Sequence, residues 1–172
     1  MEKSMTAETR ATRVALVTGA SGAIGSAIAQ KLAADGMAVA VHWSTNQAGA
    51  EASVAAVKKA GGTAIAVQTD LHQTNKVKFL FQTILDRFGQ LDVVVANACA
   101  GAPPAALKDI DDDDLDMALD ANVKATFKVL RQAANTVADH GRVIAISSSL
   151  VDFPSAGMAA YAGRTALISI CA

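Results

Sequence analysis

A glycine-rich turn between an apolar run and an amphipathic segment constrains the fold more than any other feature of the sequence. The run at residues 14–17 leads into Thr18-Gly19-Ala20-Ser21-Gly22-Ala23-Ile24-Gly25, and residues 23–34 follow with helical periodicity. The first glycine permits a tight turn, small side chains let the backbone approach a phosphate, and a helix start presents N–H groups. Strand, turn and helix in this order are typical of a nucleotide-binding α/β domain.

The rest of the chain repeats this alternation. Short, almost wholly apolar runs predict strands at residues 14–17, 38–42, 63–67, 91–95 and 142–147. Amphipathic segments predict helices at residues 23–34, 47–60, 75–88, 113–138 and 157–172. Such alternation indicates a doubly wound parallel sheet of the Rossmann type, with helices on both faces. We expect one α/β domain over residues 13–172, after a flexible tail at residues 1–12.

Composition and charge exclude several function classes. The 15 basic residues nearly balance 16 acidic ones, which argues against nucleic acid as a partner. No charge-free apolar run approaches the roughly 18 residues that cross a bilayer, so no membrane association is expected. The polar first residues lack the apolar centre of a secretory signal, and a cytoplasmic location is the expectation.

No metal site is expected. The two cysteines, Cys99 and Cys171, have no metal-ligand spacing and are interpreted as free thiols. The acidic run at residues 111–114 could be interpreted as a metal site, but adjacent carboxylates at a helix start point in different directions. They suit the positive end of the helix dipole, and a solvated helix start is the favoured interpretation.

The glycine turn matches TGxxx(A/G)xG at Thr18, Gly19, Ala23 and Gly25, and so resembles the short-chain dehydrogenase/reductase family. Further matches follow at strand ends and in helices: Asp70, Asn97, Asn122, Ser148 and Tyr161. The chain is similar to 3-oxoacyl-carrier-protein reductases and other NADP-dependent carbonyl reductases. The resemblance implies an NAD(P)-dependent oxidoreductase that transfers hydride between the nicotinamide and a small carbonyl or alcohol substrate.

The resemblance also implies which residues contact the dinucleotide. These would be Thr18, Gly19, Ser21, Ala23, Ile24, Gly25, Ser44, Asp70, Leu71, Asn97 and Ala98, with the Asp70 carboxylate accepting from the adenine amino group. The family often has Asn-Asn-Ala-Gly after the fourth strand, whereas this chain has Ala96-Asn97-Ala98-Cys99. Cys99 places a Cβ where glycine leaves the backbone free, so altered affinity is expected.

The end of the second strand favours NADP over NAD. NAD-dependent sites place a carboxylate on the adenosine ribose about 20 residues beyond the glycines. This chain has His42-Trp43-Ser44-Thr45-Asn46 there, with hydroxyl and amide groups, no carboxylate and no Arg or Lys. Two plainer interpretations stay open: Ser44 and Asn46 cap the next helix, and His42 packs at a strand end.

The catalytic set implied by the family departs from its motif at one position. Tyr161 would donate a proton to the substrate oxygen, Ser148 would orient that oxygen, and Asn122 would hold a helix backbone and a water. The family's Lys, four residues after Tyr and on the same helix face, is Thr165 here; neighbouring Arg164 is a weaker substitute. Bringing a phenol from its usual range near 10 to near 7 takes about 4 kcal/mol, more than a neutral hydroxyl supplies. Carbonyl reduction should therefore suffer less than alcohol oxidation, which needs the phenolate.

Four other expectations complete the interpretation. The alternative is a catalytically degenerate family member that serves as a nucleotide-binding or interaction protein. Thr165 in place of the family's Lys favours it, and so does the observation that family members usually continue through further strands. A shortened chain would leave residues 142–147 as an apolar edge prone to association. A P-loop phosphotransferase is disfavoured, since Gly25-Ser26 lacks the required Lys. By resemblance, pairing through the fourth and fifth helices would give a homodimer or homotetramer.

Overall fold

Five parallel strands form one sheet in the order β3-β2-β1-β4-β5. The structure is a computed structural model and describes residues 12–100, 104–153 and 155–162. The strands are β1 (Val14–Val17), β2 (Ala38–Trp43), β3 (Ala64–Gln68), β4 (Val93–Ala96) and β5 (Arg142–Ala145). All four neighbouring pairs are parallel, with Val14 opposite Ala38 and Val93 opposite Arg142. The predicted doubly wound sheet is confirmed.

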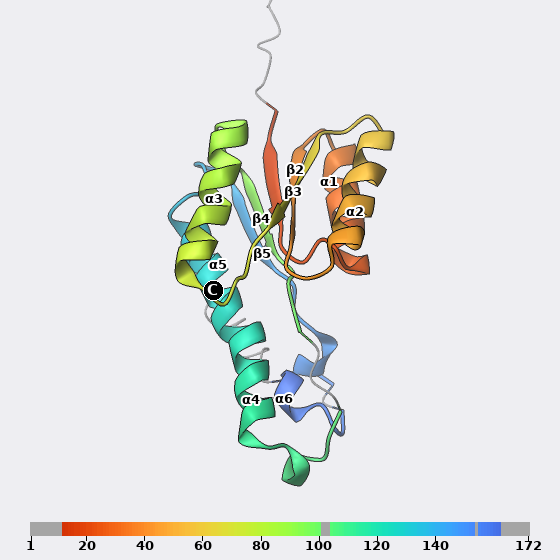
Figure 1. Ribbon diagram of the computed structural model, residues 1–172, viewed down its shortest axis with the longest axis vertical. Coiled ribbons are helices and arrows are strands. Elements are labelled where there is room, and N and C mark those ends of the chain that lie inside the picture. Colours follow the sequence, from red (N-terminus) through yellow and green to blue (C-terminus); the bar gives the residue numbers. More distant parts are fainter. Residues whose placement is uncertain (1–11, 101–103, 154, 163–172) are drawn as a thin grey trace, which may run out of the picture.

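Helices cover both faces of the sheet (Figure 1). On one face lie α1 (Ala23–Ala34) and α2 (Gln47–Lys59), and on the other α3 (Thr74–Phe88) and α5 (Ala125–Ala134). Each face has its own core: Leu16, Leu80, Phe81 and Ile84 are buried on the α3 side, and Val17, Val39 and Val41 on the α1 side. Strands buried on both faces explain the continuous apolar runs in the sequence.

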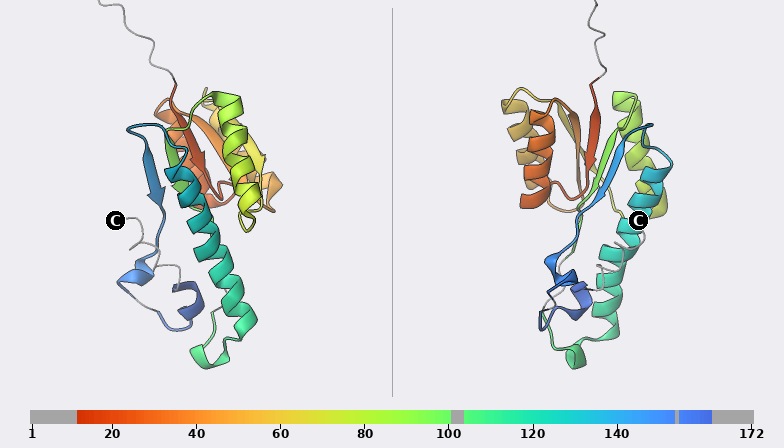
Figure 2. Two further views of the ribbon diagram at one scale, coloured as in Figure 1. Left: turned by 90° about the vertical axis from the view of Figure 1, so that its left-hand side faces the viewer. Right: turned by 180° about the vertical axis from the view of Figure 1, so that it is seen from behind.

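The segment after β4 extends beyond the carboxyl edge of the sheet (Figure 2). It carries a short 3-10 turn at Leu107–Asp109 and α4 (Asp112–Leu119); a second 3-10 turn at Ser149–Val151 and α6 (Ala159–Ala162) follow β5. The Asp111 carboxylate accepts from the Asp114 N–H at 2.8 Å, so the acidic run starts α4, as the helix-start interpretation predicts.

The predicted helix at residues 113–138 is wrong as a single α-helix. Between α4 and α5 the backbone forms a π-helical turn over Asp120–Lys124, and α5 ends at Ala134. This turn buries Asn122, which is 2% exposed. A π turn carries one extra residue relative to the α pattern, and the periodicity of the apolar side chains does not reveal it.

The other predicted boundaries in the described residues agree with the structure to within two residues, and those at residues 14–17 and 23–34 match it. Strand pairing stops at Ala145, whereas the apolar run suggested residue 147, and β3 extends to Gln68. The predicted tail at residues 1–12 and the predicted helix at residues 157–172 fall mostly outside the described residues. No helix in the described ranges combines the length and hydropathy needed to cross a bilayer.

Candidate cofactor and active site

A cavity of about 550 Å³ lies at the carboxyl edge of the sheet, against the glycine turn. Its walls come from the turn and α1 start, from the loops after β2, β3 and β4, and from the π turn and α5. They are Gly19, Ser21, Gly22, Ala23, Ile24, Gly25, His42, Ser44, Thr45, Leu71, His72, Asn97, Ala98, Cys99, Ala100, Ala121 and Ala125. The structure thus brings together nine of the eleven residues predicted to contact the dinucleotide.

The glycine turn has the shape of a cradle for a phosphate. Gly19 has a φ of +65°, and a Cβ on it would lie 2.8 Å from Ala98 Cα. A Cβ on Gly25 would lie 2.6 Å from the Gly19 oxygen and 2.7 Å from Ala20 Cα. The N–H groups of the first turn of α1, beginning at Ala23, have no preceding helical acceptor. Close packing and unpaired N–H groups at a helix start suit a diphosphate.

Thr18, a predicted contact residue, does not line the cavity but bonds to the backbone of two residues that do. Its hydroxyl accepts from the Asn97 N–H at 2.9 Å and the Ala98 N–H at 3.0 Å, and donates to the Val95 oxygen at 3.3 Å. The Asn97 amide returns a bond to the Thr18 oxygen at 2.9 Å. Thr18 is 1% exposed, so its role is to join the ends of β1 and β4.

Polar side chains outside the predicted set also hold the turn. The Asn46 amide donates to the Ser21 oxygen at 3.2 Å and its oxygen caps α2. Buried Ser53 lies within 2.8 Å of the Ala20 oxygen. His42 accepts from the Gly19 N–H at 3.1 Å. Both plainer interpretations are met in part: Asn46 does cap α2, and His42 is buried at a strand end.

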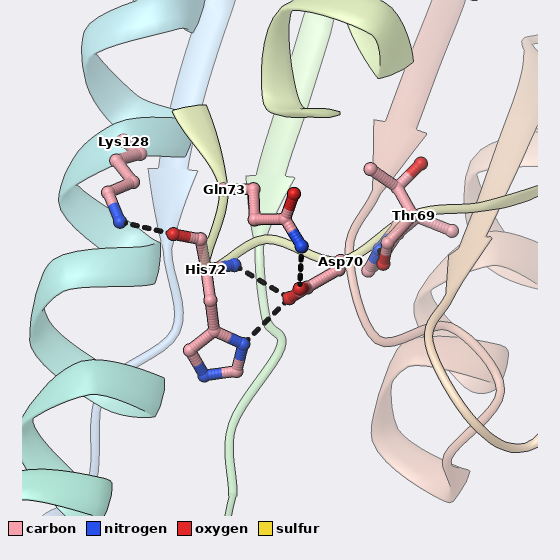
Figure 3. Close-up of polar contacts among 6 residues, drawn as sticks. Thr69, Asp70, His72, Gln73 and Lys128 are labelled. Atoms are coloured by element: carbon pink, nitrogen blue, oxygen red, sulfur yellow. Dashed lines mark hydrogen bonds and ion pairs between the residues drawn. The ribbon is translucent and has the colours of Figure 1, made fainter. Parts of the chain in front are cut away.

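Asp70 lies beside the cavity and is already hydrogen-bonded (Figure 3). One oxygen accepts from the His72 N–H at 2.9 Å and meets His72 Nδ1 at 2.8 Å, and the other accepts from Gln73 at 2.9 Å. These donors, first the His72 backbone N–H, hold the pKa of Asp70 below its usual value. Lys128 of α5 donates to the His72 oxygen at 2.6 Å, which fixes the loop against the helix.

No carboxylate lines the cavity among the described residues; its lining groups with ionisable nitrogen are His42 and His72. Ser44 and Thr45 line the wall at the end of β2. An anionic group on the adenosine ribose would therefore meet hydroxyl groups there and no lining carboxylate. This wall has the donor set that the sequence suggested for NADP.

The three predicted catalytic residues that the structure describes, Asn122, Ser148 and Tyr161, are not among the residues that line the cavity. Asn122 accepts from the Ala100 N–H and donates to the Ala100 oxygen, both at 3.0 Å, so it holds the loop after β4. Ser148 follows β5, and its hydroxyl accepts from the Leu150 N–H at 3.3 Å. Tyr161 of α6 is half-buried. Thr165 and Arg164 lie outside the described residues.

Cys99 connects Tyr161 to the cavity. It lines the cavity, and its Sγ lies 3.9 Å from the Tyr161 Oη. Among described non-glycine residues only His140 has a positive φ. Cys99 therefore adopts an ordinary backbone conformation, and this position does not need the freedom of the family's glycine.

Comparison with known proteins places these features in a family. A model described as short chain dehydrogenase matches residues 13–169. An uncharacterized oxidoreductase of Methylorubrum extorquens is 38% identical over 88% of this chain and 60% of its own length. Hydroxynaphthalene reductase of Aspergillus fumigatus is 34% identical over 91% of this chain and 57% of its own.

A solved structure agrees. A short chain dehydrogenase from Burkholderia cenocepacia in complex with NADP superposes with a TM-score of 0.84, at 36% identity, over 93% of this chain and 66% of its own. The chain thus spans about 60% of the length of the curated relatives that it matches. With the sheet order, the glycine turn and these matches in agreement, the chain belongs to the short-chain dehydrogenase family.

Proposed function

We propose that the chain binds NADP(H) and takes part in reducing a small carbonyl substrate to an alcohol. This proposal rests on the cradle formed by Gly19, Gly25 and the start of α1. A side chain at either glycine would collide with neighbouring backbone atoms, so the shape of the cradle depends on glycine at both positions. NADP is favoured over NAD because hydroxyl groups and no carboxylate line the wall after β2. The complex of the Burkholderia cenocepacia relative with NADP supports the same choice.

The proposed chemistry divides between cofactor and protein. The nicotinamide supplies the hydride when the cofactor is bound. Tyr161 donates the proton to the substrate oxygen, Ser148 orients that oxygen, and Asn122 holds the Ala100 backbone at the cavity wall. With Thr165 at the position of the family's Lys, a neutral Tyr161 can still act as an acid, which suits reduction better than oxidation.

Binding is tested first, with the single tryptophan as a probe. Trp43 ends β2, next to His42 and Ser44 of the cavity wall. Its emission should change on titration with NADPH, and less with NADH. A folded sample whose emission and melting temperature respond to neither nucleotide would overturn the proposal.

Catalysis is tested in both directions with Thr165→Lys. Ketone reduction and alcohol oxidation are measured in the parent chain and in the variant. We expect the variant to gain more in oxidation than in reduction, because a cationic neighbour favours the phenolate. An unchanged ratio of the two rates would contradict the assigned role of position 165.

A catalytically degenerate nucleotide-binding protein is the second candidate. Thr165 favours it, since a motif Lys is replaced by a neutral residue. It predicts nucleotide binding without turnover across a panel of ketones. Turnover of any of them would favour the reductase.

We also propose that two chains pair through α4 and α5, which together span the predicted fourth helix at residues 113–138; the predicted fifth helix at residues 157–172 falls mostly outside the described residues. Leu115, Met117 and Phe127 on these helices are 41%, 53% and 41% exposed, an apolar surface suited to a second copy. Phe127→Lys should shift the chain from dimer to monomer in sedimentation experiments. A dimer unaffected by this substitution would place the interface elsewhere.

A further inference from the structure

His42 is buried at the end of β2 and bonded on both ring nitrogens. The side chain is 1% exposed. Its Nδ1 accepts from the Gly19 N–H at 3.1 Å, and its Nε2 lies 3.0 Å from the Thr69 oxygen. A backbone N–H can only donate and a carbonyl can only accept, so the ring is neutral with its proton on Nε2.

The backbone of the same residue holds the next amide of the turn. The Ala20 N–H donates to the His42 oxygen at 2.9 Å. Two successive N–H groups of the glycine turn therefore end on His42, while Thr69 anchors the ring from the end of β3. His42 thus ties β1, β2 and β3 together at the edge where the cavity opens.

These bonds divide the amides of the turn into two groups. The N–H groups of Gly19 and Ala20 are bound to His42, and that of Gly22 donates to the Gly19 oxygen at 3.2 Å. The N–H groups of Ala23, Ile24 and Gly25 begin α1 and have no preceding helical carbonyl, whereas the Ser26 N–H donates to the Gly22 oxygen at 2.9 Å. The direction of these amides depends on how the preceding turn is held.

We propose that His42 is a positioning residue for the dinucleotide, because it holds Gly19 and Ala20 so that the first-turn amides of α1 face the diphosphate. The inference rests on the proposed function. An imidazolium has no acceptor at Nδ1, so protonation breaks the bond from Gly19. Cofactor affinity is therefore linked to the protonation of a residue that does not touch the nicotinamide.

Burial lowers the pKa of His42 from its ordinary 6.5, and the bond to the Thr69 oxygen opposes this only in part. The ring is therefore neutral at pH 7. Cofactor affinity should therefore begin to fall only when the pH drops below the pKa of an ordinary histidine. The loss grows as the pH approaches the lowered pKa of His42.

The other ionisable groups near the site bond to one another, bond to backbone or are exposed. Asp70 and His72, in the loop after β3, are hydrogen-bonded to each other, and Lys128 of α5 donates to the His72 oxygen. Lys76, in the first turn of α3, is exposed. Within the described ranges none of these groups is hydrogen-bonded to His42. Because His72 itself lines the cavity, exposed His140, which does not line it, serves as the control histidine.

The test uses His42→Asn, His42→Leu and, as control, His140→Asn, at an exposed position whose φ of 65° Asn tolerates. An Asn amide oxygen can replace Nδ1 as the acceptor for Gly19 and does not titrate, whereas Leu fills similar space and accepts nothing. Dissociation constants for NADPH and NADH are measured by calorimetry between about pH 5 and pH 8, across the range where histidines titrate. Melting temperatures are recorded in parallel.

His42→Leu should weaken both nucleotides about tenfold at pH 7 in the folded protein, the effect of one lost hydrogen bond. His42→Asn should stay within about threefold of the parent and lose the acid dependence, which His140→Asn keeps. If His42→Leu does not fold, the pH profile of His42→Asn still shows whether the acid dependence of binding comes from His42.

Two outcomes overturn the inference: a folded His42→Leu with parental affinity, or an acid dependence that survives in His42→Asn. A merely structural role would lower the melting temperature without changing the pH profile of folded protein. If the parent chain binds neither nucleotide, the proposed function itself fails.

Discussion

At the residue scale, the three glycines of the turn have different structural roles. A Cβ at position 25 would press on the Gly19 oxygen at 2.6 Å, whereas one at position 22 would meet only that oxygen, at 3.6 Å. Gly22 also has an ordinary extended backbone, with φ of −94°. Only Gly19 and Gly25 are therefore required by their surroundings.

We predict that Gly25→Ala weakens NADPH binding at least tenfold or destabilises the fold, by about 1–3 kcal/mol of overpacking. Gly22→Ala is the matched control and should bind within about threefold of the parent. Calorimetric titration and urea unfolding of both variants test this. Equal behaviour of the two variants would show that the contacts of Gly25 do not control the cradle.

Thr18 gives a second residue-scale prediction. Thr18→Val keeps the shape of the side chain but removes the acceptor for the N–H groups of Asn97 and Ala98. Leaving buried donors unpaired should lower the free energy of unfolding by about 1–3 kcal/mol. Thr18→Ser keeps the hydroxyl and should lose less than half as much. If Val and Ser variants unfold at the same urea concentration, the hydroxyl is not what joins the strands.

The sequence predicted the turn itself but not the residues that hold it. Gly and Ala at fixed spacing, directly after an apolar run, leave few other conformations. His42, Asn46 and Ser53 carry no such signal, because polar residues at a strand end or on a helix are most often caps or surface positions. Their roles depend on contacts between residues 23 to 33 positions apart, which only the packed structure defines.

At the element scale, the π turn between α4 and α5 departs most from the predicted fold. Apolar residues recur at steps of three and four through residues 115–130, so the periodicity suggested an unbroken helix. The turn instead directs Asn122 inward, where its amide satisfies both backbone groups of Ala100. The family resemblance implied that Asn122 hydrogen-bonds the backbone of a helix. In the structure it hydrogen-bonds the loop after β4 instead.

We predict that Asn122→Leu lowers the free energy of unfolding by about 1–3 kcal/mol, since Ala100 loses both partners. It should also weaken NADPH binding, because Ala100 lines the cavity. Asn135→Ala is the control: its amide bonds the Arg131 oxygen at the exposed end of α5. That change should cost less than about 0.5 kcal/mol and leave binding unchanged. Denaturant unfolding and titration of both variants would contradict the prediction if Asn122→Leu matched the control.

At the scale of the whole molecule, the sequence predicts the Rossmann-type sheet but not where each strand ends. The observed sheet order β3-β2-β1-β4-β5 is the one expected for this topology. A strand stops where its hydrogen bonds stop, whereas hydrophobicity often continues further along the chain. At β5, residues 146 and 147 continue the predicted run but lie beyond the strand.

The outer edge of β5 decides how this 172-residue chain behaves at high concentration. Only β4 pairs with β5, and Val143 and Ile144 are 43% and 44% exposed in the described part of the chain. An apolar edge strand with one open side templates pairing with another chain. We therefore expect species larger than a dimer to accumulate as concentration rises. Val143→Lys should remove them and leave the dimer, since a charge on an edge strand blocks pairing.

The control is Phe79→Lys, which places the same charge on an equally apolar, 58% exposed position of α3, away from the sheet edge. Sedimentation velocity at several concentrations separates the two variants. Large species that persist in Val143→Lys, or vanish equally in Phe79→Lys, would mean that general surface hydrophobicity drives association. Loss in the first variant alone locates it at the β5 edge, because the two substitutions change net charge by the same amount.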